Sequence, residues 1–126
     1  PKVYTLGSSS SLDELFVPFE QGALDKVGDG FRVGGEDGFE VCRVQRGGKI
    51  TYHCPGQLVG YLIFDLAHHR QDIEWFLRRV EAALVGLLAE LGVAAHTVDG
   101  LTGVWVGDAK VAAVGVSASR WVTMHG

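Results

Sequence analysis

The densest chemistry in this sequence lies between Arg46 and Gln57, which reads RGGKITYHCPGQ. Gly47 and Gly48 allow the backbone to approach a ligand closely or to adopt a positive φ. Arg46 beside them carries a fork of N–H donors that suits a carboxylate, a phosphate or a carbonyl. A plain Gly-Gly turn with a surface arginine explains the same residues, and spacing alone favours that simpler interpretation. A phosphate loop is excluded, because the GxxxxGK[ST] pattern does not fit.

Cys54 invites a nucleophilic role, since His53 precedes it directly. Adjacent residues of an extended strand point to opposite faces, so these two side chains are not expected to form a Cys-His pair. Cys42 and Cys54 also lack the close spacing of a zinc site, and we expect no metal. The pair His68-His69 fits a polar cap region at a helix entrance. We therefore expect that Cys54 is not a nucleophile.

Lys110 stands in a run of small and apolar residues, AKVAAVGV. In an extended strand one face would carry Ala112, Val114 and Val116, and the other Val111, Ala113 and Gly115. A lysine desolvated there would favour its neutral, proton-accepting form. The alternative, which the pattern favours, is a lysine beside a hairpin turn that extends its amine to water. The small neighbours leave space for a ligand, or equally for packing against a helix.

Several elements must position these residues. Alternating or apolar runs predict strands at Val3–Leu6, Phe39–Val44 and Ile50–His53, and a buried strand at Leu58–Leu66. Turns are expected at Gly47-Gly48 and Pro55-Gly56, and residues 7–38 are expected to form a long loop with one short helical turn and an apolar island at Leu15–Phe19. Such a loop is either a binding loop or a plain insertion.

One helix is expected, with Asp72 as N-cap, Glu74 in the first turn and Gly92 after its end. Apolar residues at steps of three and four define its buried face, which must cover a sheet. They are Ile73, Phe76, Leu77, Val80, Leu84, Leu87, Leu88 and Leu91. The side chains of Arg78, Arg79, Glu81 and Glu90 are expected to point away from this face.

The last third of the sequence predicts sheet. A type II′ hairpin is expected at Gly107-Asp108, followed by a polar break at Ser117–Arg120 and an extended run at Trp121–His125. The resulting fold class is mixed α/β or α+β: one sheet with at least one long helix packed on it, in a single domain over residues 1–126.

Composition narrows the function classes. The 126 residues are 47% hydrophobic and 21% charged, which is typical of a globular domain. The net charge of −4 argues against a nucleic-acid surface, and no apolar run has the length of a membrane span. Two cysteines make no disulfide framework, so a reducing compartment is expected. The first and last residues fall in strand-like runs, which suggests a fragment of a larger domain.

Three stretches resemble the lipoyl(octanoyl) transferase family: RGGKITYHCPGQLVGYLIFDL, HHRQDIEWFLRRVE and DGLTGVWVGDAKVAAVGVSASRWVTMHG. The resemblance covers most of residues 39–126 and the opening PKVYTLG, and is weak over residues 8–38. It implies a mixed sheet flanked by helices, as in the catalytic domain of biotin and lipoate ligases. It also implies transfer of an octanoyl group from acyl carrier protein to a lysine of lipoyl domains, including those of 2-oxoacid dehydrogenases and the glycine cleavage H protein. The resemblance implies no cofactor and no ATP, because the incoming thioester is already activated.

The resemblance also implies the roles of individual residues. It makes Lys110 the catalytic lysine, which lowers the pKa of a nucleophilic cysteine; that thiolate takes the acyl group before passing it on. It implies that one site is lined by Arg46, Gly47, Gly48, Lys49, Ile50, Thr51, Tyr52, His53, Ala113, Val114 and Gly115, with Gly126 at its edge.

Two departures from the family pattern matter. Cys54 stands where the family has glycine, in HGPGQ, and its side chain could crowd the acyl tunnel. The family's nucleophilic cysteine belongs to a later segment, so this chain alone is expected to be inactive. The alternatives are an ATP-dependent lipoate or biotin ligase and a non-catalytic module that binds acyl groups or lipoyl domains. We expect a monomer without nucleic-acid or membrane partners, in bacterial cytoplasm, in plastid stroma or, as a further option, in mitochondria.

Overall fold

The computed structural model describes residues 2–11, 14, 24–27, 30–33 and 38–125. The chain divides into two compact units, residues 1–60 and residues 61–126, here called the N-terminal and C-terminal units. Each is described by itself below. The single domain over residues 1–126 stays a prediction.

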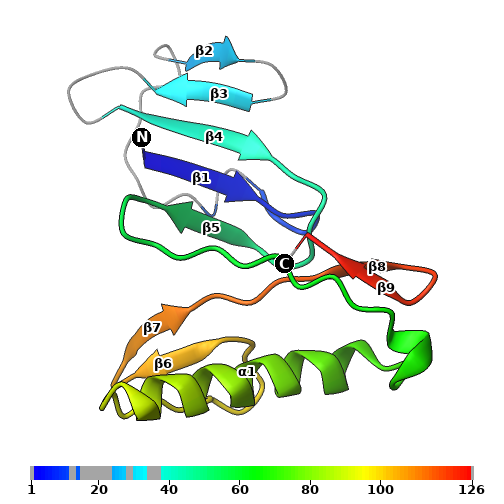
Figure 1. Cartoon of the computed structure of the whole chain (residues 1–126). Helices are drawn as coiled ribbons and strands as arrows, with labels where there is room; N and C mark the ends of the chain where they lie inside the picture. The colour runs from blue at the N-terminus through cyan, green and yellow to red at the C-terminus, as the bar shows by residue number, and fades with distance from the viewer. Residues whose placement is uncertain (1, 12–13, 15–23, 28–29, 34–37, 126) are drawn as a thin grey trace. The chain divides into compact units, whose positions relative to one another are not determined.

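The N-terminal unit is a five-stranded mixed sheet (Figure 1). Its strands are β1 (Lys2–Leu6), β2 (Leu24–Val27), β3 (Gly30–Val33), β4 (Phe39–Arg43) and β5 (Ile50–His53), in the order β2-β3-β4-β1-β5. β1 runs parallel to β4 and antiparallel to β5, and β2, β3 and β4 form an antiparallel meander. The predictions for β1, β4 and β5 are confirmed.

The prediction of a loop over residues 7–38 is wrong in part, because β2 and β3 lie within it. These strands have four residues each, and β3 pairs along its whole length with β4. Such short, glycine-flanked strands owe their existence to the neighbouring strand rather than to their own propensity. The apolar island at Leu15–Phe19 lies outside the described residues.

The register of β1 divides the sheet into two faces. Tyr4 pairs with Tyr52 on one side and Val41 on the other, and Leu6 pairs with Ile50. This face holds the buried core of the unit, Leu6, Phe39 and Val41. The ring of Tyr4 contacts those of Phe39 and Tyr52, at centroid distances of 5.1 and 4.8 Å. Because side chains alternate along a strand, Thr5, Thr51 and His53 share the opposite face.

The C-terminal unit contains the short 3-10 helix η3 (Leu66–His68) and the long helix α1 (Ile73–Glu90). Two hairpins follow: β6 (Val104–Val106) pairs with β7 (Ala109–Ala112), and β8 (Ser117–Ser119) pairs with β9 (Val122–Met124). In the described part of the chain these are two separate two-stranded sheets, so the expectation of one sheet is wrong. α1 contacts β6. The α+β class is confirmed.

Both ends of α1 lie where the sequence predicted them. The Asp72 carboxylate accepts a 2.9 Å bond from the N–H of Trp75, and Glu74 lies in the first turn. Gly92 has φ +78°, and the N–H groups of Gly92 and Val93 donate to the carbonyls of Ala89 and Leu88. This is a complete Schellman motif. No helix in the described ranges is long and apolar enough to span a membrane.

The prediction that Glu81 points away from the buried face is wrong: its exposure is 0%. On α1 only Phe76 and Glu81 are buried, and Leu87 is half exposed. The periodic pattern counts only apolar side chains, whereas the carboxylate of Glu81 is satisfied by Arg78, one turn earlier on α1, and by the N–H of Gly103, 22 residues later.

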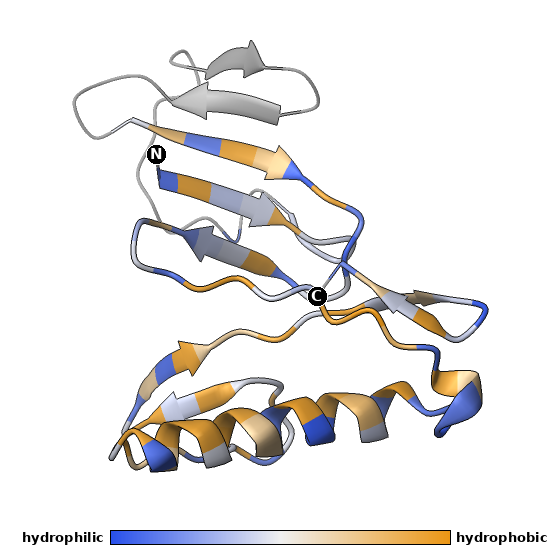
Figure 2. Cartoon of the chain, viewed as in Figure 1, coloured by the Kyte–Doolittle hydropathy of each residue, from blue (hydrophilic) through white to orange (hydrophobic). Residues whose placement is uncertain are grey.

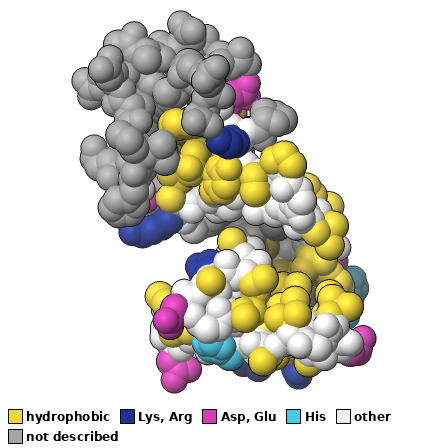
Figure 3. Space-filling model, turned by 90° about the vertical axis from the view of Figure 1, so that its left-hand side faces the viewer, with side chains coloured by type: hydrophobic (Ala, Val, Ile, Leu, Met, Phe, Trp, Pro, Cys, Tyr) yellow, Lys and Arg dark blue, Asp and Glu magenta, His cyan; other side chains and the backbone are white. Residues whose placement is uncertain are grey.

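The buried strand predicted at Leu58–Leu66 is wrong as well. Leu58 is 94% and Ile63 70% exposed, and the run before η3 is drawn as coil in Figure 2; only Leu66, the first residue of η3, is buried. Figure 3 shows hydrophobic side chains open to solvent on the face that it draws. A strand requires partners for its backbone, and here only the end of the run finds them. The Thr123 hydroxyl accepts from the N–H of Phe64 and donates to the carbonyl of Leu62, which ties this end to β9.

The two hairpins test the predictions made for the last third of the sequence. Gly107 has φ +55° and Asp108 has no positive φ, which confirms the type II′ turn. The strand that carries Lys110 ends at Ala112, so the face pattern expected as far as Val116 is wrong. The polar break at residues 117–120 is instead β8 and a turn, because β9 supplies a partner for these polar residues.

Candidate functional site

Arg46 turns its guanidinium onto its own loop. Its two terminal nitrogens donate to the carbonyls of Gly47 (3.1 Å), Lys49 (2.7 Å) and Thr5 (2.8 Å) and to the Thr5 hydroxyl (2.7 Å). These bonds use four of the five N–H donors of the side chain. Burial lowers the pKa of Arg46 from its ordinary value, although arginine stays charged. In the described part of the chain, Arg46 holds the turn in place and joins it to β1.

The turn is also closed by glycines and serines. Gly48 has φ +82°, and the Ser8 N–H and hydroxyl both donate to the carbonyl of Arg46, at 3.0 and 3.1 Å. Lys49 reaches outward and its ammonium lies 2.7 Å from a carboxylate oxygen of Glu14. This geometry confirms the Gly-Gly turn, and it gives Arg46 a structural task that the sequence did not indicate.

A chain of polar bonds continues from Thr5 across β5. The Thr5 hydroxyl lies 3.1 Å from His53 Nε2, and His53 Nδ1 lies 2.6 Å from Gln57 Oε1. Gln57 donates its amide nitrogen to the carbonyl of Tyr52, so its oxygen must accept from His53. The Thr5 hydroxyl accepts from Arg46 and still has its proton, which it can donate to Nε2. For a neutral imidazole the Gln57 oxygen therefore selects the Nδ1–H tautomer.

The alternation of β5 divides the predicted acyl-binding residues between two faces. Ile50 and Tyr52 share the face of the Tyr4 aromatic cluster, whereas Thr51 and His53 share the polar face with Thr5. A pocket on a single face of this sheet would use one pair or the other. The apolar pair suits a hydrocarbon chain, and the polar pair suits a carbonyl or a hydroxyl.

Cys54 is an exposed free cysteine just past β5. The ring nitrogens of His53 are both engaged by Thr5 and Gln57, so this histidine is not arranged to activate the neighbouring thiol. Within the described ranges no three histidine, cysteine or acidic side chains group as metal ligands. His68 belongs to η3 and lies 3.5 Å from Asp65, as expected for a polar cap region.

Lys110 lies at the surface of the β6–β7 hairpin. Its ammonium donates to the carbonyl of Thr102 at 3.1 Å and lies 4.7 Å from the centre of the Trp105 ring. A cation over an indole face is attracted by the ring quadrupole. Of the two interpretations drawn from the sequence, the exposed amine beside a turn is the one observed. The Thr102 carbonyl and the Trp105 ring set the direction in which this amine points.

The remaining predicted residues follow β7. Ala113, Val114 and Gly115 lie in the connection from β7 to β8, outside any strand; Ala113 is exposed, and Val114 and Gly115 are partly buried. Gly126 lies outside the described residues. Since the N-terminal and C-terminal units are described separately, the joint site that the sequence predicted stays a prediction.

Three side chains with structural tasks at these sites were missed. Thr5 and Gln57 complete the His53 network, and Glu81 bonds the segment before β6. Gln57 lies in the quoted PGQ stretch, where its proximity to His53 was a usable signal. Thr5 gave none, because its partners Arg46 and His53 are 41 and 48 residues away in the sequence. For Glu81 the i,i+3 spacing from Arg78 was a usable signal, but the bond to Gly103, 22 residues away, was not.

Comparison with known proteins identifies the family. Residues 1–126 match the lipoyl protein ligase A/B catalytic domain. The chain belongs to the lipoyl protein ligase A/B catalytic domain family. The resemblance noted in the sequence and its mixed sheet-and-helix class are thereby confirmed.

Curated proteins similar to this chain carry the name octanoyltransferase. The protein of Nostoc sp. (strain PCC 7120) is 45% identical over 126 residues, which cover all of this chain and 50% of that protein. The proteins of Synechococcus elongatus and Gloeobacter violaceus are 46% and 44% identical, with 48% and 49% of their length covered. The chain thus spans about half the length of these curated relatives.

Proposed function

We propose that this chain is part of an octanoyltransferase, which moves an octanoyl group from octanoyl-acyl carrier protein to a lysine of lipoyl domains. The observation that carries the proposal is the 45% identity to the Nostoc octanoyltransferase over the whole of this chain. The acceptors would be the lipoyl domains of 2-oxoacid dehydrogenases and the glycine cleavage H protein. The compartment that we propose is bacterial cytoplasm or plastid stroma, with mitochondria as a further option.

The proposed reaction has two acyl transfers. A cysteine thiolate attacks the thioester carbonyl, the bond to the carrier sulfur breaks, and the carrier leaves as its thiolate. The neutral amine of the acceptor lysine then attacks the acyl-cysteine, forms the amide and releases the cysteine thiol. Both steps start from an activated thioester, so the reaction needs no ATP. The proposed nucleophile is a cysteine outside this sequence, and the 126-residue chain alone is expected to be inactive.

Lys110 would favour the thiolate in this reaction. Its ammonium is exposed and directed by the Thr102 carbonyl and the Trp105 ring. An ammonium has three N–H donors, and the bond to Thr102 uses one of them. The other two suit a thiolate, whose pKa a neighbouring cation lowers.

The apolar face of β5 would hold the acyl chain. Ile50 and Tyr52 lie on this face next to Tyr4 and Phe39. An octanoyl tail gains roughly 0.8 kcal/mol for each methylene that it buries. The polar bonds of Arg46 would keep the turn before β5 in the shape that this face needs.

The test is a chimera in which this chain replaces the matching half of the Nostoc octanoyltransferase. We expect it to move octanoyl from acyl carrier protein to an apo lipoyl domain without ATP, as measured by mass spectrometry of the acceptor. Lys110→Met should lower the rate by about 100-fold or more, by analogy with the removal of other positioned charges. Arg79→Met, which removes an exposed cation of α1, is the matched control and should keep the rate.

Other results would favour the alternatives. Transfer that requires ATP would indicate a lipoate or biotin ligase. Binding of the acyl carrier without acyl transfer in the chimera would indicate a non-catalytic module. Octanoyl transfer by the 126-residue chain alone, lost in Cys54→Ser, would make Cys54 the nucleophile and overturn the proposed mechanism.

A further inference from the structure

Glu81 is a fully buried carboxylate in the middle of α1, with an exposure of 0%. One carboxylate oxygen accepts from the N–H of Gly103 at 2.7 Å, and the other accepts from Arg78 at 2.7 Å. A buried charge is costly unless it is paired and hydrogen-bonded. Each oxygen of Glu81 thus accepts a charge-assisted hydrogen bond, and such bonds are stronger and more directional than bonds between neutral groups.

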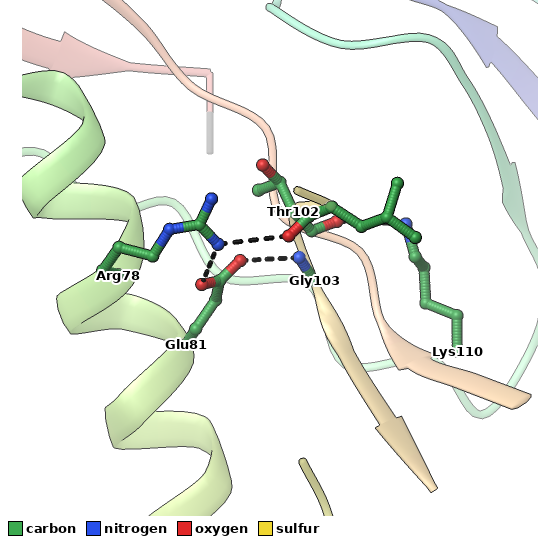
Figure 4. Close-up of polar contacts among 6 residues, drawn as sticks. Arg78, Glu81, Thr102, Gly103 and Lys110 are labelled. Atoms are coloured by element: carbon green, nitrogen blue, oxygen red, sulfur yellow. Dashed lines mark hydrogen bonds and ion pairs between the residues drawn. The ribbon is translucent and has the colours of Figure 1, made fainter. Parts of the chain in front are cut away.

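The same pair of side chains holds both ends of a three-residue segment. Arg78 also donates to the carbonyl of Leu101 at 3.1 Å, so α1 bonds residues 101 and 103 together. Figure 4 shows Arg78 and Glu81 reaching from α1 to this segment, with Lys110 on its other side. The peptide between the two bonded residues carries the carbonyl of Thr102, which is the acceptor of the Lys110 ammonium.

Lys110 lies directly over this segment. A Cβ built on Gly103 would stand 3.0 Å from Lys110 Cε and 2.8 Å from the carbonyl of Ala112. Gly103 has φ +138°, a conformation that L side chains rarely adopt. The backbone at Gly103 is therefore shaped to let the lysine side chain pass, and Glu81 bonds the N–H of that same residue.

We propose that Glu81 is a positioning residue for Lys110: through Gly103 and Arg78 it fixes the Thr102 carbonyl, which directs the ammonium. The role of Lys110 in catalysis rests on the proposed function. The effect of Glu81 on the position of the Lys110 side chain does not depend on it. Loss of the Glu81 charge would loosen residues 101–103 and let the ammonium leave the Trp105 ring. A misdirected ammonium would no longer favour the thiolate.

The position of Lys110 can be read by NMR in the 126-residue chain. We expect the ring current of Trp105 to shift the Lys110 ε-methylene proton resonance, because the ammonium lies over the face of the ring. Lys110→Arg assigns this resonance among the four lysines of the sequence. We expect Glu81→Gln to move it toward the value of a free lysine, and Glu90→Gln, an exposed position of the same helix, to leave it unchanged.

Activity is then measured in the chimera. We expect Glu81→Gln to lower kcat by about 10- to 100-fold with little change in KM, the size of effect that a small misplacement causes. The lost rate should return as the pH is raised, because a less favoured thiolate forms at higher pH. A merely structural role would lower the rate equally at every pH.

Each outcome decides the proposal. A folded Glu81→Gln chain with an unchanged Lys110 resonance overturns it. If this variant unfolds, Arg78→Gln replaces it, with Arg79→Gln as its control; an unchanged resonance in Arg78→Gln, or unfolding of both variants, would reduce the pair to a structural role. An inactive chimera of unchanged sequence would refute the proposed function, and the resonance would still test the link between Glu81 and Lys110.

Discussion

Gly7 lies so close to Gly48 that a Cβ built on it would stand 2.1 Å from the Gly48 carbonyl oxygen. The same Cβ would come within 2.9 Å of Arg46 Nη1, the nitrogen that donates to Gly47 and Lys49. The end of β1 and the turn before β5 are thus packed backbone against backbone. The absence of a side chain at Gly7 is a condition for the position of this turn.

Gly7→Ala should therefore displace the turn. We expect it to lower the free energy of unfolding by about 1–3 kcal/mol, because the nearest atom is backbone and has no rotamer to change. Urea denaturation followed by fluorescence measures the loss. Gly60→Ala is the control, since a Cβ there meets nothing within 4 Å, and it should be neutral. Equal stability of the two variants would contradict the close approach.

The His53 network predicts a specific tautomer. Nδ1 should carry the proton and Nε2 should be unprotonated, because Gln57 presents an oxygen and Thr5 a hydroxyl proton. Nitrogen-15 NMR at about pH 8.5, where histidines are neutral, distinguishes the two nitrogens. Gln57→Leu should raise the population of the Nε2–H form, whereas Gln71→Leu should not. An Nε2–H tautomer in the unchanged chain would refute the assignment.

Arg46→Lys should destabilise the N-terminal unit although the charge is kept. A lysine cannot place four donors in the plane that the Thr5, Gly47 and Lys49 acceptors require. We expect a loss of about 2 kcal/mol, the net value of the one or two charge-assisted bonds that lysine cannot replace. Arg43→Lys is the matched control in the same denaturation experiment, because the bond of Arg43 to the Ser10 carbonyl is a weak one of 3.4 Å. A larger loss of unfolding free energy in Arg43→Lys than in Arg46→Lys would show that the effect comes from any exchange of arginine for lysine and not from the bonds of Arg46.

The sequence predicted best those elements that local chemistry determines. The N-cap at Asp72, the Schellman end at Gly92 and the type II′ turn at Gly107 depend on residues within four or five positions of one another. Strands β1, β4 and β5 were also found, since their side chains alternate. Long-range relationships were not found: the pairing of β3 with β4 and the bond of Glu81 to Gly103 join residues with no shared local pattern.

The run Leu58–Leu66 was misjudged for a related reason. An apolar run predicts burial, but burial needs a surface to pack on, and sequence periodicity carries no information about that surface. In the described part of the chain, the backbone from Leu62 onward is bonded to Trp121 and Thr123, while Leu58 and Ile63 stay exposed. At the candidate site the residue types indicated a binding segment, but the prediction did not separate the two faces of its strand. Ile50 and Tyr52 lie on one face of β5, and Thr51 and His53 lie on the other.

Two glycines of the helical region predict effects of opposite sign. Gly86 lies in α1, where a Cβ would meet nothing within 4 Å, so Gly86→Ala should stabilise the chain by about 0.5–1 kcal/mol. Gly92 has φ +78°, so Gly92→Ala should cost about 1–2 kcal/mol. Thermal unfolding followed by circular dichroism measures both. A stabilising Gly92→Ala would contradict the Schellman geometry.

The turn between β8 and β9 carries backbone strain that a substitution should relieve. Arg120 and Trp121 have φ values of +49° and +65°, so both central residues of this two-residue hairpin are left-handed. Such a type I′ turn favours asparagine at its first central position, and a left-handed arginine costs about 1–2 kcal/mol. Arg120→Asn should recover about half of this cost and raise the thermal midpoint. Ser119→Asn, in the neighbouring strand residue, is the control and should be neutral or destabilising, because asparagine is depleted in strands. A lower midpoint for Arg120→Asn than for Ser119→Asn would show that the arginine side chain contributes more than the strain removes.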